Sequence, residues 1–293
     1  MRKLFKNPHF LMLLYSILVA GSFTVGHLIT SYMDSILLIF TRFFLASIIF
    51  GFYIIIKYKP KWPSLKDSAR YFAISSTLVL YFWGMFESLK YTTPIKTGII
   101  YTLVPMFSTC YGYFLLKEKP SCLKIMVLFF AMTGAIWVIS DGSILKLLNL
   151  DFGKGDILFL LACMSMGLFS PFSKLFSGEE ETPVMTFWTL VTGTIILFFP
   201  AFNEIIRYQW LLFPVKLAAG LLYLVIFPTI ITFFIVQYSS QKMEVSKVMS
   251  YIYMIPVFVV FIQMVTIKVL PEPVILPGII ISGICTFLFQ KIN

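Results

Sequence analysis

The sequence predicts an all-α membrane protein with ten transmembrane helices, arranged as two inverted repeats of five helices, with both termini in the cytoplasm. Three observations predict it: the apolar composition, ten apolar runs, and segments that match between the two halves. Hydrophobic residues make up 59% of the 293 positions, and charged residues only 12%. Because soluble domains carry about 25% charged residues, this composition places nearly the whole chain in a lipid bilayer.

Ten apolar runs approach the length of about 20 residues that a helix needs to cross a bilayer. In the first half they are residues 8–29, 35–56, 71–90, 95–116 and 123–139, and in the second half 155–176, 184–202, 215–238, 245–267 and 274–289. Prolines, glycines and charged residues separate the runs. The first run follows a basic start, but it is longer than the apolar core of a signal peptide, so we expect it to be retained as a helix.

The longest polar interval divides the chain into a first repeat (1–141), a connecting loop (142–154) and a second repeat (155–293). Since five spans per repeat is an odd number, the second repeat must enter the membrane from the opposite side, which makes the repeats inverted. Lys and Arg are more numerous in the loops on the side of the termini, which predicts that this side is cytoplasmic. We expect a bacterial inner membrane, and we assign the net charge of +10 to orientation and lipid headgroups rather than to nucleic acid.

Two segments of equal length, Ser88–Phe107 and Ser239–Phe258, align without a gap and suggest a duplication. They are identical at Ser88/Ser239, Lys96/Lys247, Pro105/Pro256 and Phe107/Phe258. Gly21 in the first run and Gly167 in the sixth run give a second match. These glycines are expected to allow close packing of helices.

The fourth run carries a further pattern. Tyr91, Thr92, Pro105, Leu115, Leu116 and Glu118 fall along it, and Gly134 lies in the middle of the next run. With Gly21 and the ten-run spacing, this pattern resembles the EamA-like branch of the drug/metabolite transporter superfamily. The resemblance implies secondary transport of a small metabolite, often an amino acid, from a central cavity. The direction of transport does not carry over from the family, and we expect export or exchange. Lys96 and Lys247 depart from the pattern, because small or polar residues are usual there.

Ionisable groups inside a span are costly, by about 3 kcal/mol or more, so they usually face a cavity or a partner. Arg42 lies two helical turns into the second run, where it could bind a carboxylate or phosphate; the alternatives are a pair with Glu87 or a position at the headgroups. Glu87 could bind an amine or a coupling proton, or it could form a surface pair with Lys90.

Lys96 and Lys247 begin the fourth and ninth runs, at opposite faces of the membrane if the repeats are inverted. A lysine at a helix start opposes the helix dipole, so we predict a gate at each face, with Lys96 pairing with Glu87 and Lys247 with Glu244. The alternative is that both lysines are interfacial anchors.

Aromatic residues with a polar atom and prolines inside runs complete the predicted site. Substrate contacts are predicted for Trp83, Tyr101, Trp188 and Tyr251. Hinges are predicted at Pro105, Pro256, Pro171 and Pro228, because proline removes a backbone hydrogen bond.

Two other functions stay as alternatives: a flippase-type carrier of lipid-linked sugars, and a membrane-embedded enzyme. The enzyme is disfavoured because the sequence contains neither GxSxG nor HExxH. We expect no cofactor and no metal. The expected partners are a small-molecule substrate, the lipid bilayer and, as one of several coupling alternatives, a proton. The expected oligomeric state is a monomer or a weak dimer.

Overall fold

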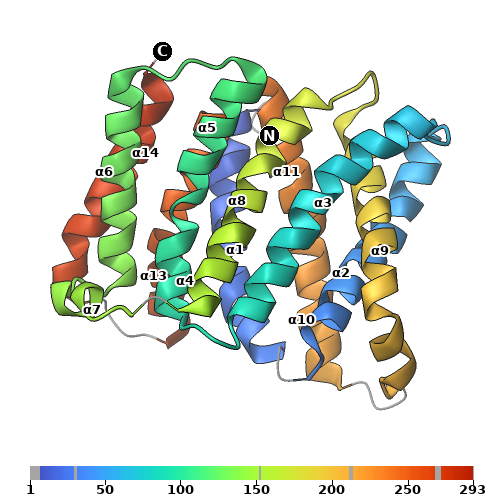
Figure 1. The fold of residues 1–293 in the computed structure, drawn as a ribbon, viewed down its shortest axis with the longest axis horizontal. Helices are drawn as coiled ribbons and strands as arrows, with labels where there is room; N and C mark the ends of the chain where they lie inside the picture. Colours follow the sequence, from blue (N-terminus) through green and yellow to red (C-terminus); the bar gives the residue numbers. More distant parts are fainter. Residues whose placement is uncertain (1–6, 30–31, 152, 211–213, 268–271, 293) are drawn as a thin grey trace.

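The computed structural model describes residues 7–29, 32–151, 153–210, 214–267 and 272–292, and these residues form helices and connecting segments without a strand. The helices lie side by side, and α1 (Pro8–Ile29) begins at the same end of the bundle at which α14 (Leu276–Lys291) ends (Figure 1). We call this end the terminal face and the opposite end the distal face. The common position of the two termini agrees with an even number of membrane crossings.

The remaining helices follow the predicted runs. The first half adds α2 (Ser35–Tyr58), α3 (Leu65–Ser88), α4 (Pro94–Tyr101), α5 (Val104–Leu116) and α6 (Cys122–Ile139). The short helix α7 (Ile144–Leu148) lies in the connecting loop. The second half adds the α-helices α8 (Lys154–Leu175), α9 (Thr182–Arg207), α10 (Val215–Val225), α11 (Thr232–Lys242), α12 (Val245–Ser250) and α13 (Ile255–Ile267). The π-helix η3 (Ile226–Ile231) joins α10 to α11. The 3₁₀ helix η4 (Tyr251–Met254) precedes α13, and the 3₁₀ helix η5 (Pro273–Ile275) precedes α14.

Among the described residues, eight helical segments are long and apolar enough to cross a membrane. They correspond to the second run and to the fourth to tenth runs. The first and third runs also form helices, of 22 and 24 residues. Helix α3 begins at Leu65, earlier than predicted, because Ser64 and Asp67 form a capping box that nucleates a polar first turn.

The fourth and ninth runs are not the continuous helices that were predicted. Helix α4 ends at Tyr101 and α5 begins at Val104, immediately before Pro105. Helix α13 likewise begins at Ile255, immediately before Pro256. Because proline has no backbone N–H, the chain turns at each break through tighter 3₁₀-type bonds, such as that of 3.0 Å from the Leu103 N–H to the Ile100 carbonyl.

The same offset relates the boundaries of these broken helices. Helices α4 and α12 begin 151 residues apart (245 − 94), as do α5 and α13 (255 − 104). This is the offset of the matching sequence segments. The break therefore occurs at equivalent positions of the two halves.

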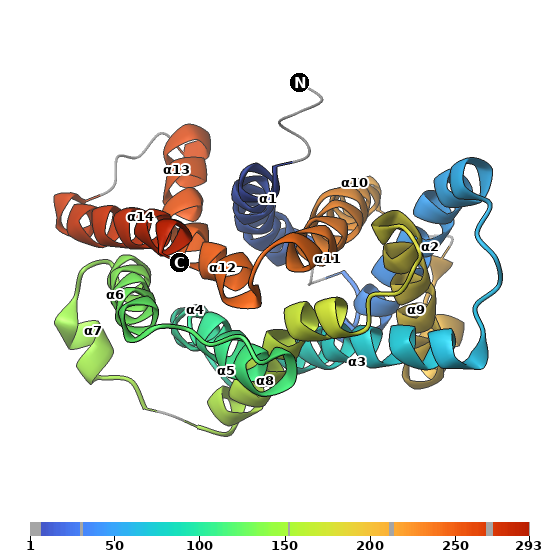
Figure 2. The ribbon, with the colours of Figure 1, turned by 90° about the horizontal axis from the view of Figure 1, so that it is seen from above.

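The two halves are interlocked. Helix α1 packs against α10, α11 and α13, whereas α8 packs against α3 and α5, so the first helix of each half contacts the third and fourth helices of the other. Seen along the helices, α2 and α9 pack together at one lateral side of the molecule, and α6 and α14 pack together at the opposite side (Figure 2). The central part of the molecule is therefore built from both halves.

The predicted glycines lie at close helix contacts. A Cβ atom on Gly167 would lie 2.8 Å from the Cβ of Phe107 in α5, and one on Gly21 would collide with the hydroxyl of Tyr223 in α10. Gly134 of α6 meets the backbone of Gly278 and Ser282 in α14. Small residues thus allow helices of different halves to approach closely.

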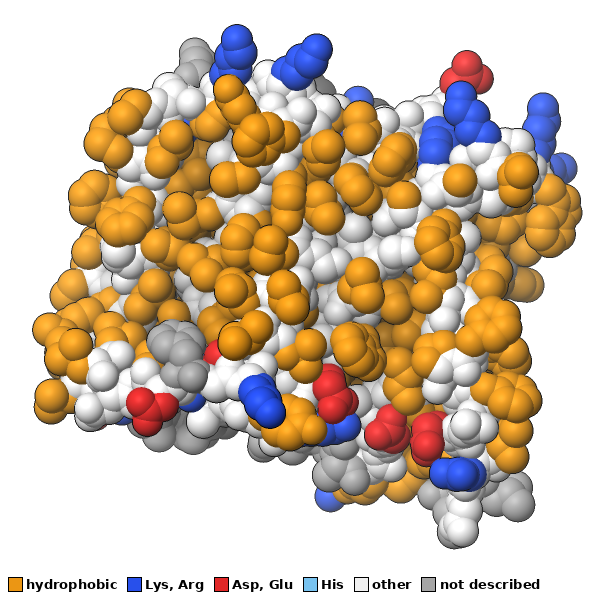
Figure 3. All heavy atoms as spheres, in the orientation of Figure 1, with side chains coloured by type: hydrophobic (Ala, Val, Ile, Leu, Met, Phe, Trp, Pro, Cys, Tyr) orange, Lys and Arg blue, Asp and Glu red, His pale blue; other side chains and the backbone are white. Residues whose placement is uncertain are grey.

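The surface agrees with a membrane environment. Large apolar side chains are exposed along the helices, among them Phe52, Phe114 and Phe199. Figure 3 shows hydrophobic side chains over the middle of the bundle and charged side chains gathered at the two ends. An exposed apolar belt of this kind is suited to contact with acyl chains.

Candidate substrate site

Arg42 is buried in the interior of the bundle without an acidic partner. It is the eighth residue of α2, and 4% of its surface is exposed. One guanidinium nitrogen, Nη2, donates to the hydroxyl of Thr229 at 3.0 Å, and the group lies 4.8 Å from the centroid of the Phe82 ring. Its Nε has no hydrogen-bond partner. In the described part of the chain no carboxylate lies within ion-pair distance of Arg42, so the alternative that it pairs with Glu87 is wrong.

The position of Thr229 follows from the neighbouring proline. Pro228 has no N–H, so the Leu224 carbonyl loses the donor that an α-helix would supply four residues later. The Thr229 hydroxyl donates to this carbonyl instead, at 2.7 Å, and can still accept from Arg42. Here the chain forms the π-helix η3, a structure that is often found at functional sites.

Acidic residues are confined to the ends of the helices. All 13 Asp and Glu residues of the chain are described, and each lies in a loop, at a helix cap, or within four residues of a helix end. Arg42 is seven residues inside α2, which corresponds to about 10 Å of helix. No carboxylate of the described residues therefore balances its charge, which makes Arg42 a candidate for binding an anion.

Aromatic rings surround the guanidinium. The Phe82 ring lies 6.2 Å from both Phe43 and Phe233, and the latter two rings are 5.7 Å apart, measured between centroids. Tyr81 is buried next to Phe82, and its ring lies 5.9 Å from that of Tyr101. The predicted residue Tyr101 is thus connected to the surroundings of Arg42 through Tyr81.

The two predicted tryptophans lie apart from this group. Trp83 is 44% exposed, although its neighbours Tyr81 and Phe82 point into the bundle, so the structure does not place it at a central site. Trp188 is buried and lies 6.5 Å from the nearly parallel ring of Tyr71.

At the distal face, Lys96 is bound to the other half of the molecule. Its Nζ lies 3.4 Å from the carboxylate of Asp156 in the first turn of α8 and also donates to the Asp151 carbonyl. The Asp156 carboxylate, 2% exposed, accepts from the Thr92 hydroxyl and from the N–H of Gly153. We call Lys96, Asp156 and Thr92 the distal lock.

The predicted pair of Lys96 with Glu87 is wrong, because the start of α8 brings Asp156 beside α4. Glu87 instead forms a surface ion pair with Lys90 at 2.6 Å, in which the side chains are 28% and 51% exposed. The hydrogen bond to the Glu87 carboxylate raises the pKa of Lys90.

At the terminal face, Lys247 lines an open polar hollow. The hollow, which we call the vestibule, has a volume of about 470 Å³ and is lined by Pro8, His9, Lys174, Gln241, Lys242, Met243, Glu244 and Lys247. Lys247 donates to the Gln290 carbonyl at 3.4 Å. The predicted pair of Lys247 with Glu244 is not formed in this structure, because Glu244 pairs with Lys124 of α6 at 2.7 Å.

Other contacts at the terminal face join the two halves. Glu118 forms an ion pair with Lys174 at 2.7 Å and accepts from the N–H of Val245 at 3.0 Å, so it caps the start of α12. The predicted residue Tyr251 lies 3.0 Å from the imidazole Nδ1 of His9, measured from its hydroxyl oxygen. The equivalent lysines thus differ: Lys96 is tied to a carboxylate, and Lys247 borders the vestibule.

The prolines inside helices also differ from one another. Pro171 lies within the continuous helix α8, whereas Pro228 lies in η3. Pro105 and Pro256 mark the breaks of the fourth and ninth runs. Three of the four predicted hinges therefore coincide with a departure from regular α-helix.

Sequence reasoning missed several polar contacts. Gln237 of α11 is fully buried and donates to the hydroxyl of Thr189 at 3.0 Å, while Thr186 donates to its side-chain carbonyl. The helical spacing of these threonines in α9 could have indicated a polar face. Asp156 could have been found as the acidic residue at the start of a predicted span.

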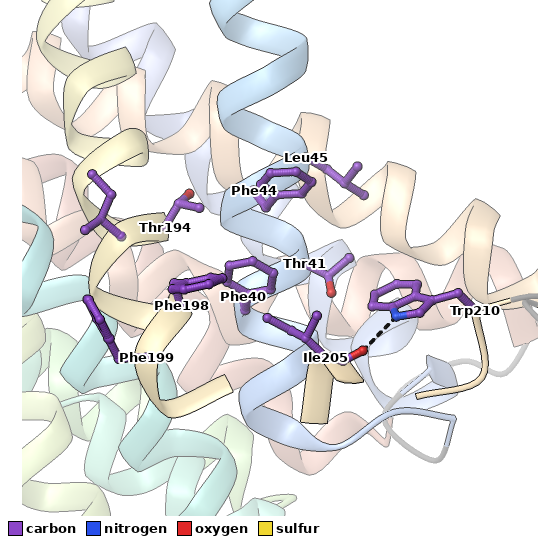
Figure 4. A pocket seen from close by; sticks show the side chains of 10 residues that line it. Phe40, Thr41, Phe44, Leu45, Thr194, Phe198, Phe199, Ile205 and Trp210 are labelled. Carbon is purple, nitrogen blue, oxygen red and sulfur yellow. Dashed lines mark hydrogen bonds between the residues drawn. The ribbon is translucent and has the colours of Figure 1, made fainter. Parts of the chain in front are cut away.

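A second hollow, of about 860 Å³, lies between α2 and α9 (Figure 4). Its lining carries no charge, and its polar side chains Thr41, Thr194 and Trp210 all donate to backbone carbonyls. The hollow therefore suits an acyl chain rather than a polar solute.

Comparison with known proteins identifies the family. The sequence model of the EamA-like transporter family matches residues 7–140 and 153–289. The chain is 23% identical over 193 residues to the uncharacterized transporter YyaM of Bacillus subtilis (strain 168), a match that spans 65% of this chain and 63% of the relative. It is 24% identical over 254 residues to an uncharacterized transporter of Archaeoglobus fulgidus, with 86% of each chain covered.

A solved structure, named "Crystal structure of protein", has the same fold, with a TM-score of 0.73, 16% sequence identity and 97% of each chain covered. The family match, which spans nearly the whole chain, together with the apolar helices shows that this is an integral, multi-pass membrane protein. The chain belongs to the EamA-like transporter family, within the drug/metabolite transporter superfamily.

Proposed function

We propose that the protein is a secondary active transporter that moves a small metabolite, an amino acid or a related zwitterionic or anionic compound, by export or exchange across a bacterial inner membrane. The observation that carries this proposal is Arg42, which is buried among aromatic rings without a carboxylate partner in the described residues. A buried charge of this kind is retained where it binds a ligand.

The proposed architecture is ten spans in two inverted repeats. The shared offset of 151 residues (255 − 104) between the broken helices supports a duplication. The reciprocal contacts of α1 and α8 with the opposite halves support a two-fold relation between the repeats. An inverted pair of repeats gives two equivalent gates, one for each face of the membrane.

The proposed transport cycle alternates between these two faces. In this structure the distal lock ties α4 to α8, while the vestibule is open at the terminal face. These features correspond to a state that is closed toward the distal face. In the opposite state, Lys96 and Asp156 separate, and the helices around Lys247 come together.

The alternative carrier of lipid-linked sugars would use the hollow between α2 and α9. This hollow has the size for an acyl chain, but its lining offers no charged group for a phosphate-linked headgroup. The buried guanidinium therefore favours a small solute.

Solute counterflow in proteoliposomes tests the proposal. We expect liposomes loaded with unlabelled amino acids and organic acids to accumulate at least one labelled member of this mixture. Arg42→Gln should reduce the accumulation at least tenfold. Lys57→Gln removes an equal charge from the exposed end of the same helix and should leave it unchanged. The proposal fails if no solute of the mixture exchanges, or if Arg42→Gln exchanges it as fast as the wild type.

A further inference from the structure

We infer that the transported solute is an organic monocarboxylate with an apolar or aromatic body and without an ammonium group. This inference rests on the proposed function and narrows its substrate range. It follows from the charges and the rings around Arg42.

The charge of the site requires an anion. The guanidinium of Arg42 is buried, its only polar partner in the described residues is the neutral hydroxyl of Thr229, and its Nε is unpaired. A carboxylate presents two oxygens to two nitrogens of a guanidinium. It would therefore satisfy the open donor and balance the charge in one step.

The same charge distribution argues against a second ionic group on the solute. A carboxylate would be the charge partner of an ammonium group, and none of the 13 acidic residues lies deeper than the fourth residue from a helix end. A dianion such as a phosphate monoester would bring one negative charge more than Arg42 neutralises. A monoanion is the charge type that the interior balances.

The body of the solute is defined by the aromatic side chains. Phe43, Phe82 and Phe233 form a continuous cluster beside the guanidinium, and the Phe169 ring lies 5.7 Å from that of Phe233. Rings at these distances favour offset or edge-to-face contacts with a further flat or apolar group. An amphipathic acid matches these apolar surroundings better than a sugar or a polyol.

The charges of the vestibule also support an anionic solute. Two charges of the vestibule are paired, Lys174 with Glu118 and Glu244 with Lys124. Lys242 and Lys247 form no ion pair with the described residues, so the field of the vestibule attracts anions. Gln241, Gln237, Phe233 and Thr229 then follow one another at intervals of four residues, and so on one side of η3 and α11. Gln241 lines the vestibule and Thr229 binds Arg42, so this helix extends from the vestibule to the level of the guanidinium.

Binding to the purified full-length protein tests the inference with matched probes. Phenylacetate, phenylalanine, phenethylamine and phenylacetamide share one ring and differ in charge, and hexanoate adds a non-aromatic acid. Thermal stabilisation is measured for the wild type, for Arg42→Gln, and for Lys57→Gln as the charge-matched control. We expect the two carboxylates to stabilise the wild type and Lys57→Gln, with apparent affinity at least tenfold above that of the other probes. Arg42→Gln should lose this stabilisation.

Three results would overturn the inference: stronger binding of the amine or the amino acid, equal stabilisation of Arg42→Gln by the carboxylates, or no binding of either carboxylate at millimolar concentration. Counterflow separates this failure from that of the proposed function. If amino acids exchange across liposomes but carboxylates do not, the protein is a transporter and only the monocarboxylate assignment is wrong.

Discussion

Arg42 and Lys96 show which properties of a single residue can be predicted from sequence. The burial of Arg42 is predictable, because it lies two turns inside an apolar run. Its partner is not, since Thr229 is 187 positions away and its hydroxyl is directed by the helix distortion at Pro228. Lys96 was correctly placed at a helix start, but its partner comes from the other half, where the approach of α8 to α4 decides the contact.

The distal lock gives a prediction at the residue scale. Asp156→Asn removes the charge that balances Lys96 and weakens the acceptor for Thr92 and Gly153. We expect a loss of about 3 kcal/mol in the free energy of unfolding, as for one partner of a buried pair. Unfolding of the purified protein in a denaturant series measures this loss.

Glu87→Gln is the matched control, because it breaks the exposed pair with Lys90. A surface pair contributes at most about 1 kcal/mol. Equal destabilisation by the two substitutions would show that the distal lock contributes no more than a surface pair.

At the scale of helices, capping residues and prolines determine helix boundaries that hydropathy alone does not predict. The apolar runs located the helices, but Ser64 and Asp67 extend α3 toward its N-terminus, and Pro105 and Pro256 divide two runs. At Pro228 the sequence predicted a hinge but not the π-helix η3. The register of η3 depends on which side-chain hydroxyl replaces the N–H that Pro228 lacks, and here it is the hydroxyl of Thr229.

Thr229→Val tests the role of η3. The substitution keeps the shape of the side chain but removes the bonds to the Leu224 carbonyl and to Arg42. We expect a loss of about 2 kcal/mol in the free energy of unfolding, because two buried polar groups lose a partner. Counterflow should also fall, because the guanidinium is no longer held in place.

Thr133→Val is the control for this substitution. Thr133 is exposed on α6 and bonds only to the Phe130 carbonyl of its own helix. A similar change in stability and counterflow from both variants would contradict the role assigned to Thr229.

The packing of α6 against α14 gives a further prediction. A Cβ on Gly134 would lie 2.8 Å from the backbone nitrogen of Ser282, whereas one on Gly283 would meet no atom within 4 Å. Gly134→Ala should therefore lower the free energy of unfolding by about 1–3 kcal/mol through overpacking. Gly283→Ala should raise it by as much as about 1 kcal/mol, because alanine favours helix. The same unfolding assay measures both, and the reverse order would show that the contact between the helices is incorrectly placed.

More could be predicted from the sequence at the scale of the whole molecule than at the scale of single contacts. The membrane class and family followed from composition and from the pattern of the fourth run, and the family is confirmed by the match over residues 7–140 and 153–289. The inverted relation of the repeats stays a prediction that rests on five spans per half. The state of the proposed gates could not be predicted, because the equivalent lysines Lys96 and Lys247 differ only in their partners.

Alternating access predicts that opening one face closes the other. Reciprocal labelling of two single cysteines, in a protein whose four native cysteines are replaced, tests this directly. Met243→Cys reports on the vestibule, and Ser88→Cys reports on the distal face, where Ser88 is buried. An impermeant thiol reagent should label Met243→Cys from the cytoplasmic side and leave Ser88→Cys unlabelled. Adding Asp156→Asn should slow the first reaction and start the second from the outer side. Labelling that rises at both positions together, or at neither, would contradict a two-gate transporter.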